Sequence, residues 1–163
     1  MSFLEAVEIY FRGERHTGLA LVPFGLAMLA CGVYLFRFYG GGFGKTMGAL
    51  LACAGVAAAI GGPFLARTVN ARQAKLSEAY VTDQEAPRLQ EQKRIEKVNA
   101  SWMLLKSIWT ALMVASLASL WLLKRDWIQG VALTLVILAT VALVVDVFAE
   151  RRALTYAENI KSQ

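Results

Sequence analysis

Five ionisable side chains near the ends of long apolar runs are the residues of this sequence best suited to do chemistry. They are Glu14, His16, Lys106, Asp146 and Glu150. Carboxylates beside an imidazole or an ammonium group can relay protons or hold a cation. The alternative is that these charges form ion pairs with neighbouring arginines. His16 is the only histidine, which excludes metal sites built from several imidazoles.

Elsewhere the sequence lacks a catalytic pattern. The run Gly40-Gly41-Gly42-Phe43-Gly44-Lys45-Thr46 is similar to a phosphate-binding loop, but Tyr39 occupies the position of its first glycine. No nucleophile, base and orienting group occur at a recognisable spacing. We therefore predict no enzyme activity, no catalytic or cofactor-binding residues, no cofactor and no bound metal.

Four apolar stretches must position these charges, at residues 17–38, 46–66, 103–123 and 127–145. A helix rises ~1.5 Å per residue and the hydrocarbon layer is ~30 Å thick, so about 20 apolar residues cross it. Hydrophobic residues make up 57% of the chain and charged residues 18%, which is typical of a membrane protein. The sequence predicts an all-α polytopic protein, a single membrane domain over residues 1–163, with four transmembrane helices in two hairpins.

The tight connection between the third and fourth spans places two of the charges at one depth. Lys106 lies 20 residues before residue 126 and Asp146 lies 20 residues after it. At equal rise per residue, the two side chains are expected to face each other or to share a partner near the inner face. The alternative is that Lys106 extends to the lipid phosphates while Asp146 reaches cytoplasmic water.

Basic residues near span ends are retained in the cytoplasm. Placing the N-terminus inside leaves only Arg37, Lys45, Lys124 and Arg125 outside, so both termini are predicted to be cytoplasmic. Basic residues beside spans also attract anionic lipid head groups. The net charge of +5 therefore needs no nucleic acid to explain it, and we predict the lipid bilayer, not nucleic acid, as a partner.

Residues 1–16 are predicted to form an interfacial helix. Ser2 and Glu5 have the spacing of a capping box, and apolar side chains share one helical face, namely Phe3, Leu4, Val7, Tyr10 and Phe11. This helix is expected to lie along the inner leaflet until Gly13 lets the chain turn into the membrane. The alternative is that the same face packs on the cytoplasmic segment.

Small residues spaced along the second span predict close helix packing. Gly48, Ala52, Gly55 and Gly61 lie on its small-residue faces, and such residues let helix backbones approach each other in lipid. Pro63 follows near the inner end and lacks an amide hydrogen, so a kink or a hinge is expected there.

The polar residues 67–99 are predicted to form a cytoplasmic helical hairpin with its turn between residues 81 and 87. Its two arms either pack on each other or provide a docking surface for a partner. Residues 150–163 are expected to form a cytoplasmic tail.

Two short segments carry a resemblance. Tyr10-Phe11-Arg12-Gly13-Glu14 and Asp146-Val147-Phe148-Ala149-Glu150-Arg151-Arg152 resemble the ends of a family of small uncharacterised bacterial four-span membrane proteins. The resemblance implies a four-span layout and no activity. We predict a location in the bacterial inner membrane.

These observations favour a binding or regulatory membrane protein that engages a protein partner, or a second copy of itself, through the bundle and the hairpin. Toxin immunity and envelope assembly are functions of this kind. The alternative is a small oligomeric channel or transporter for ions or protons. Such a pore would use hydroxyl groups, which occur in the last two spans at Ser107, Thr110, Ser116, Ser119, Thr134 and Thr140.

Overall fold

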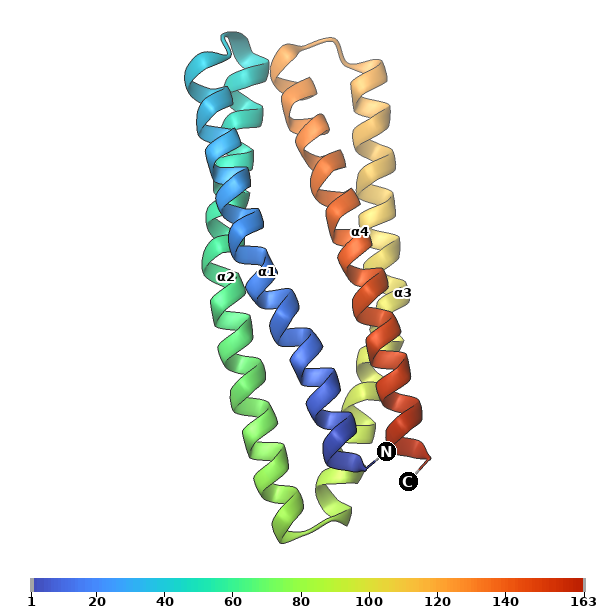
Figure 1. Ribbon diagram of the computed structural model, residues 1–163. Helices are drawn as coiled ribbons and strands as arrows, with labels where there is room; N and C mark the ends of the chain where they lie inside the picture. The colour runs from blue at the N-terminus through green and yellow to red at the C-terminus, as the bar shows by residue number, and fades with distance from the viewer. Residues whose placement is uncertain (1, 163) are drawn as a thin grey trace.

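The computed structural model describes residues 2–162, which form a bundle of four long antiparallel helices (Figure 1). They are α1 (Phe3–Phe38), α2 (Gly41–Thr82), α3 (Glu85–Leu122) and α4 (Asp126–Lys161). All four are long and apolar enough to cross a membrane, which confirms the predicted all-helical fold with four candidate transmembrane helices. Both termini lie at one end of the bundle together with the turn between α2 and α3. We call this the terminal end, and we call the opposite end the loop end.

Local chemistry explains where the helices begin. Ser2 and Glu5 form the predicted capping box, in which the Ser2 amide donates to the Glu5 carboxylate at 2.7 Å. Gly41 has φ +85° in the turn between α1 and α2, a conformation that favours glycine. At the terminal end, the Asp83 carboxylate accepts a hydrogen bond from the amide of Glu85 at 3.0 Å, within the stretch expected to turn.

The structure corrects the prediction for residues 1–16. These residues are not a separate interfacial helix, because α1 runs without a break from Phe3 to Phe38. Gly13 does not turn the chain; instead it makes room for Arg152, whose Cδ would lie 2.7 Å from a Cβ at that position. The tail predicted at residues 150–163 is likewise a continuation of α4 as far as Lys161, where the helix ends; residue 163 lies outside the described residues. The described residues near both ends of the chain, from Phe3 and up to Lys161, therefore extend the bundle.

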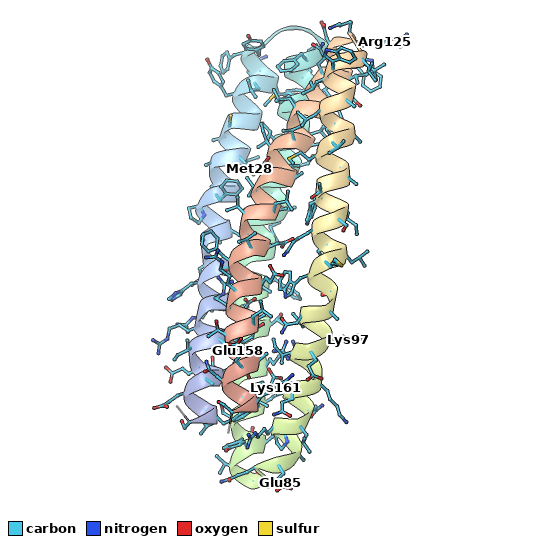
Figure 2. All side chains as sticks on the ribbon, turned by 90° about the vertical axis from the view of Figure 1, so that its right-hand side faces the viewer. Met28, Glu85, Lys97, Arg125, Glu158 and Lys161 are labelled. Carbon is cyan, nitrogen blue, oxygen red and sulfur yellow. The ribbon has the colours of Figure 1, made fainter. Side chains whose placement is uncertain are left out.

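Large apolar side chains from all four helices form a core at the terminal end. Its fully buried members include Phe3 and Val7 from α1, Ile95 from α3 and Ile160 from α4. The apolar face of residues 1–16 thus packs on the other helices, as in the alternative interpretation. Figure 2 shows charged residues around this part of the bundle, among them Lys97, Glu158 and Lys161, with Arg125 at the loop end. The terminal end is built like a water-soluble four-helix bundle.

Within the apolar part, α1 and α2 touch along a seam of glycines. Three pairs face each other, each separated from the next by seven residues on both helices: Gly18 with Gly62, Gly25 with Gly55, and Gly32 with Gly48. A Cβ atom on Gly55 would lie 2.6 Å from the Gly25 carbonyl oxygen and 2.5 Å from the Leu29 nitrogen. The backbones are therefore in direct contact, as small residues permit in lipid.

Of the residues predicted for helix packing, three lie on this seam. Gly48 and Gly55 face glycines of α1, and the Ala52 backbone lies against Gly32. Gly61 does not, because its Cβ position has no atom of a neighbouring helix within 4 Å. The neighbouring Gly62 lies on the seam instead. It follows Gly55 by seven residues, which is the spacing at which the glycines of α2 face α1. α2 continues through Pro63, so the hinge there stays a prediction.

We expect Gly55→Ala to destabilise the bundle and Gly61→Ala to leave it unchanged or slightly more stable. The added methyl group at position 55 meets backbone atoms that cannot move aside, which costs about 1–3 kcal/mol. At position 61 it meets open space, and alanine gains up to about 1 kcal/mol in helix propensity over glycine. The free energy of unfolding in mixed detergent micelles measures both. Equal destabilisation by the two variants would show that the seam does not hold α1 to α2.

Candidate functional site

Lys106 of α3 forms a salt bridge with Glu150 of α4. Both side chains are partly exposed, at 35% and 24%. Among the described residues Lys106 forms no direct salt bridge with Asp146, which was one of the two arrangements predicted from the residue count, and Asp146 Oδ2 is buried without a hydrogen-bond partner. Side-chain direction explains the difference. Helical side chains lean toward the N-terminus, so on these antiparallel helices Lys106 leans toward the terminal end and meets Glu150, one turn beyond Asp146.

A second ion pair joins α1 to α4. The Arg152 guanidinium donates to the Glu14 carboxylate at 3.1 Å and to the Thr17 hydroxyl at 3.0 Å. Gly13 leaves the space through which the Arg152 side chain passes. His16 is exposed and takes no part in this pair.

The five residues singled out in the sequence are therefore separated. Glu14 pairs on the α1 side of α4, whereas Lys106 and Glu150 pair on the α3 side. Residues 2–162 contain no group of three or more His, Cys, Asp or Glu residues that could hold a metal ion. Of the five, Glu14, Lys106 and Glu150 form ion pairs between helices, whereas no salt bridge of His16 or Asp146 occurs among the described residues; the proton relay or cation site stays a prediction.

Sequence reasoning missed a buried network at the terminal end. Glu91 is only 5% exposed and accepts two hydrogen bonds from Arg94, at 2.8 and 2.6 Å. The Tyr156 hydroxyl donates to the same carboxylate at 3.2 Å. Tyr10 stacks on Tyr156 with ring centroids 4.4 Å apart, and the Arg94 guanidinium lies 5.7 Å from the Tyr10 ring. The network ties α1, α3 and α4 together.

Burial and charge shift the pKa values in this network. Burial alone would lower the pKa of Arg94, but the hydrogen bonds and the negative charge of Glu91 raise it. Burial raises the pKa of Tyr156, and the charge of Glu91 raises it further. Burial also raises the pKa of Tyr10, with a further contribution from the charge of Glu14. At neutral pH the Arg94 guanidinium is thus charged and both phenols are protonated.

A groove with a volume of about 690 Å³ lies between α2 and α3 at the terminal end. These two helices make few contacts with each other, so the two arms of the predicted hairpin do not pack closely. Arg72 and Lys75 of α2 line one wall, and Glu91 and Arg94 line the other. Within residues 2–162, neither Arg72 nor Lys75 forms a salt bridge. We call this hollow the basic groove.

The depth of the basic groove separates it from the lipid head groups. Taking the second span to end at residue 66, Arg72 lies about 9 Å and Lys75 about 14 Å beyond it along the helix. The head-group layer on one side of a bilayer is only about 5–8 Å thick. Most of the groove therefore opens to water.

Several hydroxyl groups in the membrane part donate hydrogen bonds within their own helices. Thr134 donates to the Gly130 carbonyl at 2.8 Å, Thr140 to Val136 at 2.8 Å and Ser119 to Ala115 at 2.8 Å. This is an ordinary arrangement for such residues in transmembrane helices.

Comparison with protein-family models, with curated proteins and with solved structures finds no match. The similarity of the two ends of the chain to small bacterial four-span proteins stays a prediction.

We expect Glu91→Gln to lower the free energy of unfolding by about 2–4 kcal/mol. Removing one partner of a fully buried ion pair costs about 3–5 kcal/mol, and Arg94 keeps some access to water at 23% exposure. Glu8→Gln is the matched control, because its partner Arg12 also lies on the same helix but both side chains are 55% exposed. That change is expected to cost at most about 0.5 kcal/mol. Similar losses in both variants, measured in mixed micelles, would contradict a supporting role for the network.

Stability is expected to fall in alkaline solution. The pKa of Tyr156 is raised from its ordinary value of 10.0, so above that pH the unfolded chain releases a proton that the folded chain retains. The stabilisation is complete below pH 10.0 and is lost as the pH rises above it. Unfolding midpoints compared at about pH 8 and about pH 11 measure the effect. Tyr156→Phe should flatten this dependence, whereas Tyr34→Phe, an exposed residue at the loop end, should leave it intact.

Proposed function

We propose that this chain is a binding or regulatory protein of the bacterial inner membrane, without catalytic activity, that holds an acidic segment of a partner protein in the basic groove. The observation that carries the proposal is the pair of basic side chains, Arg72 and Lys75, that line the groove without a salt bridge among the described residues. A carboxylate-rich segment supplies the missing counter-charges.

Depth and surroundings support a protein segment as the occupant. The basic groove lies mostly beyond the head-group layer, so anionic lipids reach only its edge. Its volume of about 690 Å³ falls within the range of about 300–1,000 Å³ found for binding pockets. Apolar positions lie beside the charges, since Leu76 and Pro87 also line it. A partner segment in which acidic and apolar residues alternate would therefore complement the basic groove.

The wall formed by α3 is fixed before a partner arrives. Glu91 and Arg94 line the groove and bond to each other, and Glu91 also accepts a hydrogen bond from the Tyr156 hydroxyl of α4. A wall that is already ordered loses little conformational entropy on binding, so more of the contact energy appears as affinity. The distribution of Lys and Arg favours a cytoplasmic location for the groove, and hence a cytoplasmic partner segment.

Site-specific photo-crosslinking in cells tests the proposal. A photoreactive residue at Ala79, which lines the basic groove, should capture a protein through an acidic segment; the same residue at Lys97, on the same hairpin but outside the groove, should not. The captured segment is then synthesised as a peptide and its affinity for the purified protein in nanodiscs is measured.

We expect Arg72→Glu with Lys75→Glu to weaken binding of this peptide by about 100-fold, because two attractive contacts become repulsive. Lys93→Glu with Lys97→Glu changes the net charge equally outside the groove and should weaken it less than about threefold. Equal losses in both double variants would contradict specific docking. Capture of nucleic acid at position 79, or ion flux through liposomes carrying the purified protein, would favour other functions.

A further inference from the structure

A second groove runs along the membrane part of α3, and we call it the α3 groove. Its volume is about 880 Å³. It begins at the terminal end beside Asn99 and Trp102, passes the salt bridge between Lys106 and Glu150, and ends at Ala118. The surface of α3 is recessed there because the side chains along this face are small. They are Ser107, Ala111, Ala115 and Ala118.

The length of the α3 groove matches one leaflet of a bilayer. From Lys106 to Ala118 the helix rises about 18 Å, close to the ~15 Å of hydrocarbon in one leaflet. A transmembrane helix of a partner would instead need a surface extending across the full ~30 Å. Lys106 lies at the inner boundary of the predicted third span. The charged part of the groove is therefore at the depth of lipid head groups and the hollow part at the depth of acyl chains.

The polar groups at the head-group end offer both signs of charge. Lys106 can donate further hydrogen bonds beyond the one to Glu150, and Glu150 has a second carboxylate oxygen that can accept. A head group with a phosphate beside a primary ammonium group complements this set, because the phosphate accepts from Lys106 and the ammonium donates to Glu150.

We propose that the α3 groove binds one phospholipid with a primary ammonium head group, of the phosphatidylethanolamine class. The phosphate lies at Lys106, the ammonium group at Glu150, and one acyl chain follows the small residues to Ala118. Phosphatidylcholine fits less well because its quaternary ammonium has no N–H to donate. Phosphatidylglycerol fits less well because it brings no cation to Glu150.

Native mass spectrometry of the delipidated full-length protein in detergent tests this, with dioleoyl phosphatidylethanolamine, phosphatidylcholine and phosphatidylglycerol added separately. One phosphatidylethanolamine should bind about tenfold more tightly than either of the others. Lys106→Ala should remove most of this preference. Lys124→Ala, which removes a lysine at the other end of the third span, should keep it.

A steric variant keeps the test decisive if Lys106→Ala fails to fold. Ala115→Phe fills the α3 groove without touching a charge and should weaken phosphatidylethanolamine binding about tenfold. Ala57→Phe is its control, because Ala57 is an exposed residue of α2 outside the groove. Equal affinity for the three lipids, or unchanged binding by Ala115→Phe, would overturn the proposal. So would a dimer of the wild-type protein that Ala115→Phe dissociates, since a second copy would then fill the groove.

Discussion

Backbone contact between α1 and α2 is the constraint on which the bundle depends. Apolar side chains gain little by leaving lipid, so helices within the membrane associate through dispersion forces and weak polar contacts, and both require close approach. The facing glycines, with Gly25 against Gly55 near the middle, bring backbone atoms of the two helices into direct contact. The broad apolar faces of both helices are left free for lipid and for α4. Gly130 admits α4 in the same way near the loop end, where its Cβ position is 2.7 Å from the Phe43 carbonyl oxygen.

The same seven-residue register continues beyond the membrane part with different side chains. Residues 11 and 69 occupy the next seam positions toward the terminal end, and there Phe11 and Val69 both belong to the terminal core. Glycines give way to large apolar residues where the surroundings of the helices change from lipid to water. In water each square ångström of apolar surface buried contributes about 25 cal/mol, so large side chains stabilise the packing that glycines provide in lipid. This transition explains why residues 1–16 join the bundle: with three other apolar helix faces available, Phe3 and Val7 are buried more completely there than on a membrane surface.

The parts of the fold that depend on composition and length could be predicted from the sequence, and the parts that depend on rotation about helix axes could not. Apolar runs of about 20 residues identified the four helices, and small residues identified Gly48 and Gly55 as packing positions. Gly61 was assigned wrongly because glycine occurs on both faces of α2 and only the partner helix distinguishes them. Counting residues gave the depth of Lys106 but not the direction of its side chain, which selects Glu150. The burial of Glu91 had no local signal, since in sequence Glu91 and Arg94 are an ordinary ion pair of a surface helix.

The helix with the fewest packing contacts along its membrane part, α3, lines both candidate binding surfaces. α3 has no glycine, and between residues 103 and 123 only Ser116 is buried, so it lacks the close contact that joins α1 to α2. Its position is instead fixed near the terminal end, by Glu91 and Arg94 in the core and by Lys106 on Glu150. Ion pairs at that end hold the helix in place without covering its length. A helix anchored in this way keeps one face open to the lipid and, past the membrane, one face open to water. The positions of the glycines therefore explain why α1 and α2 pack closely together. The positions of the charges explain why α3 is held at one end and stays exposed along its membrane part.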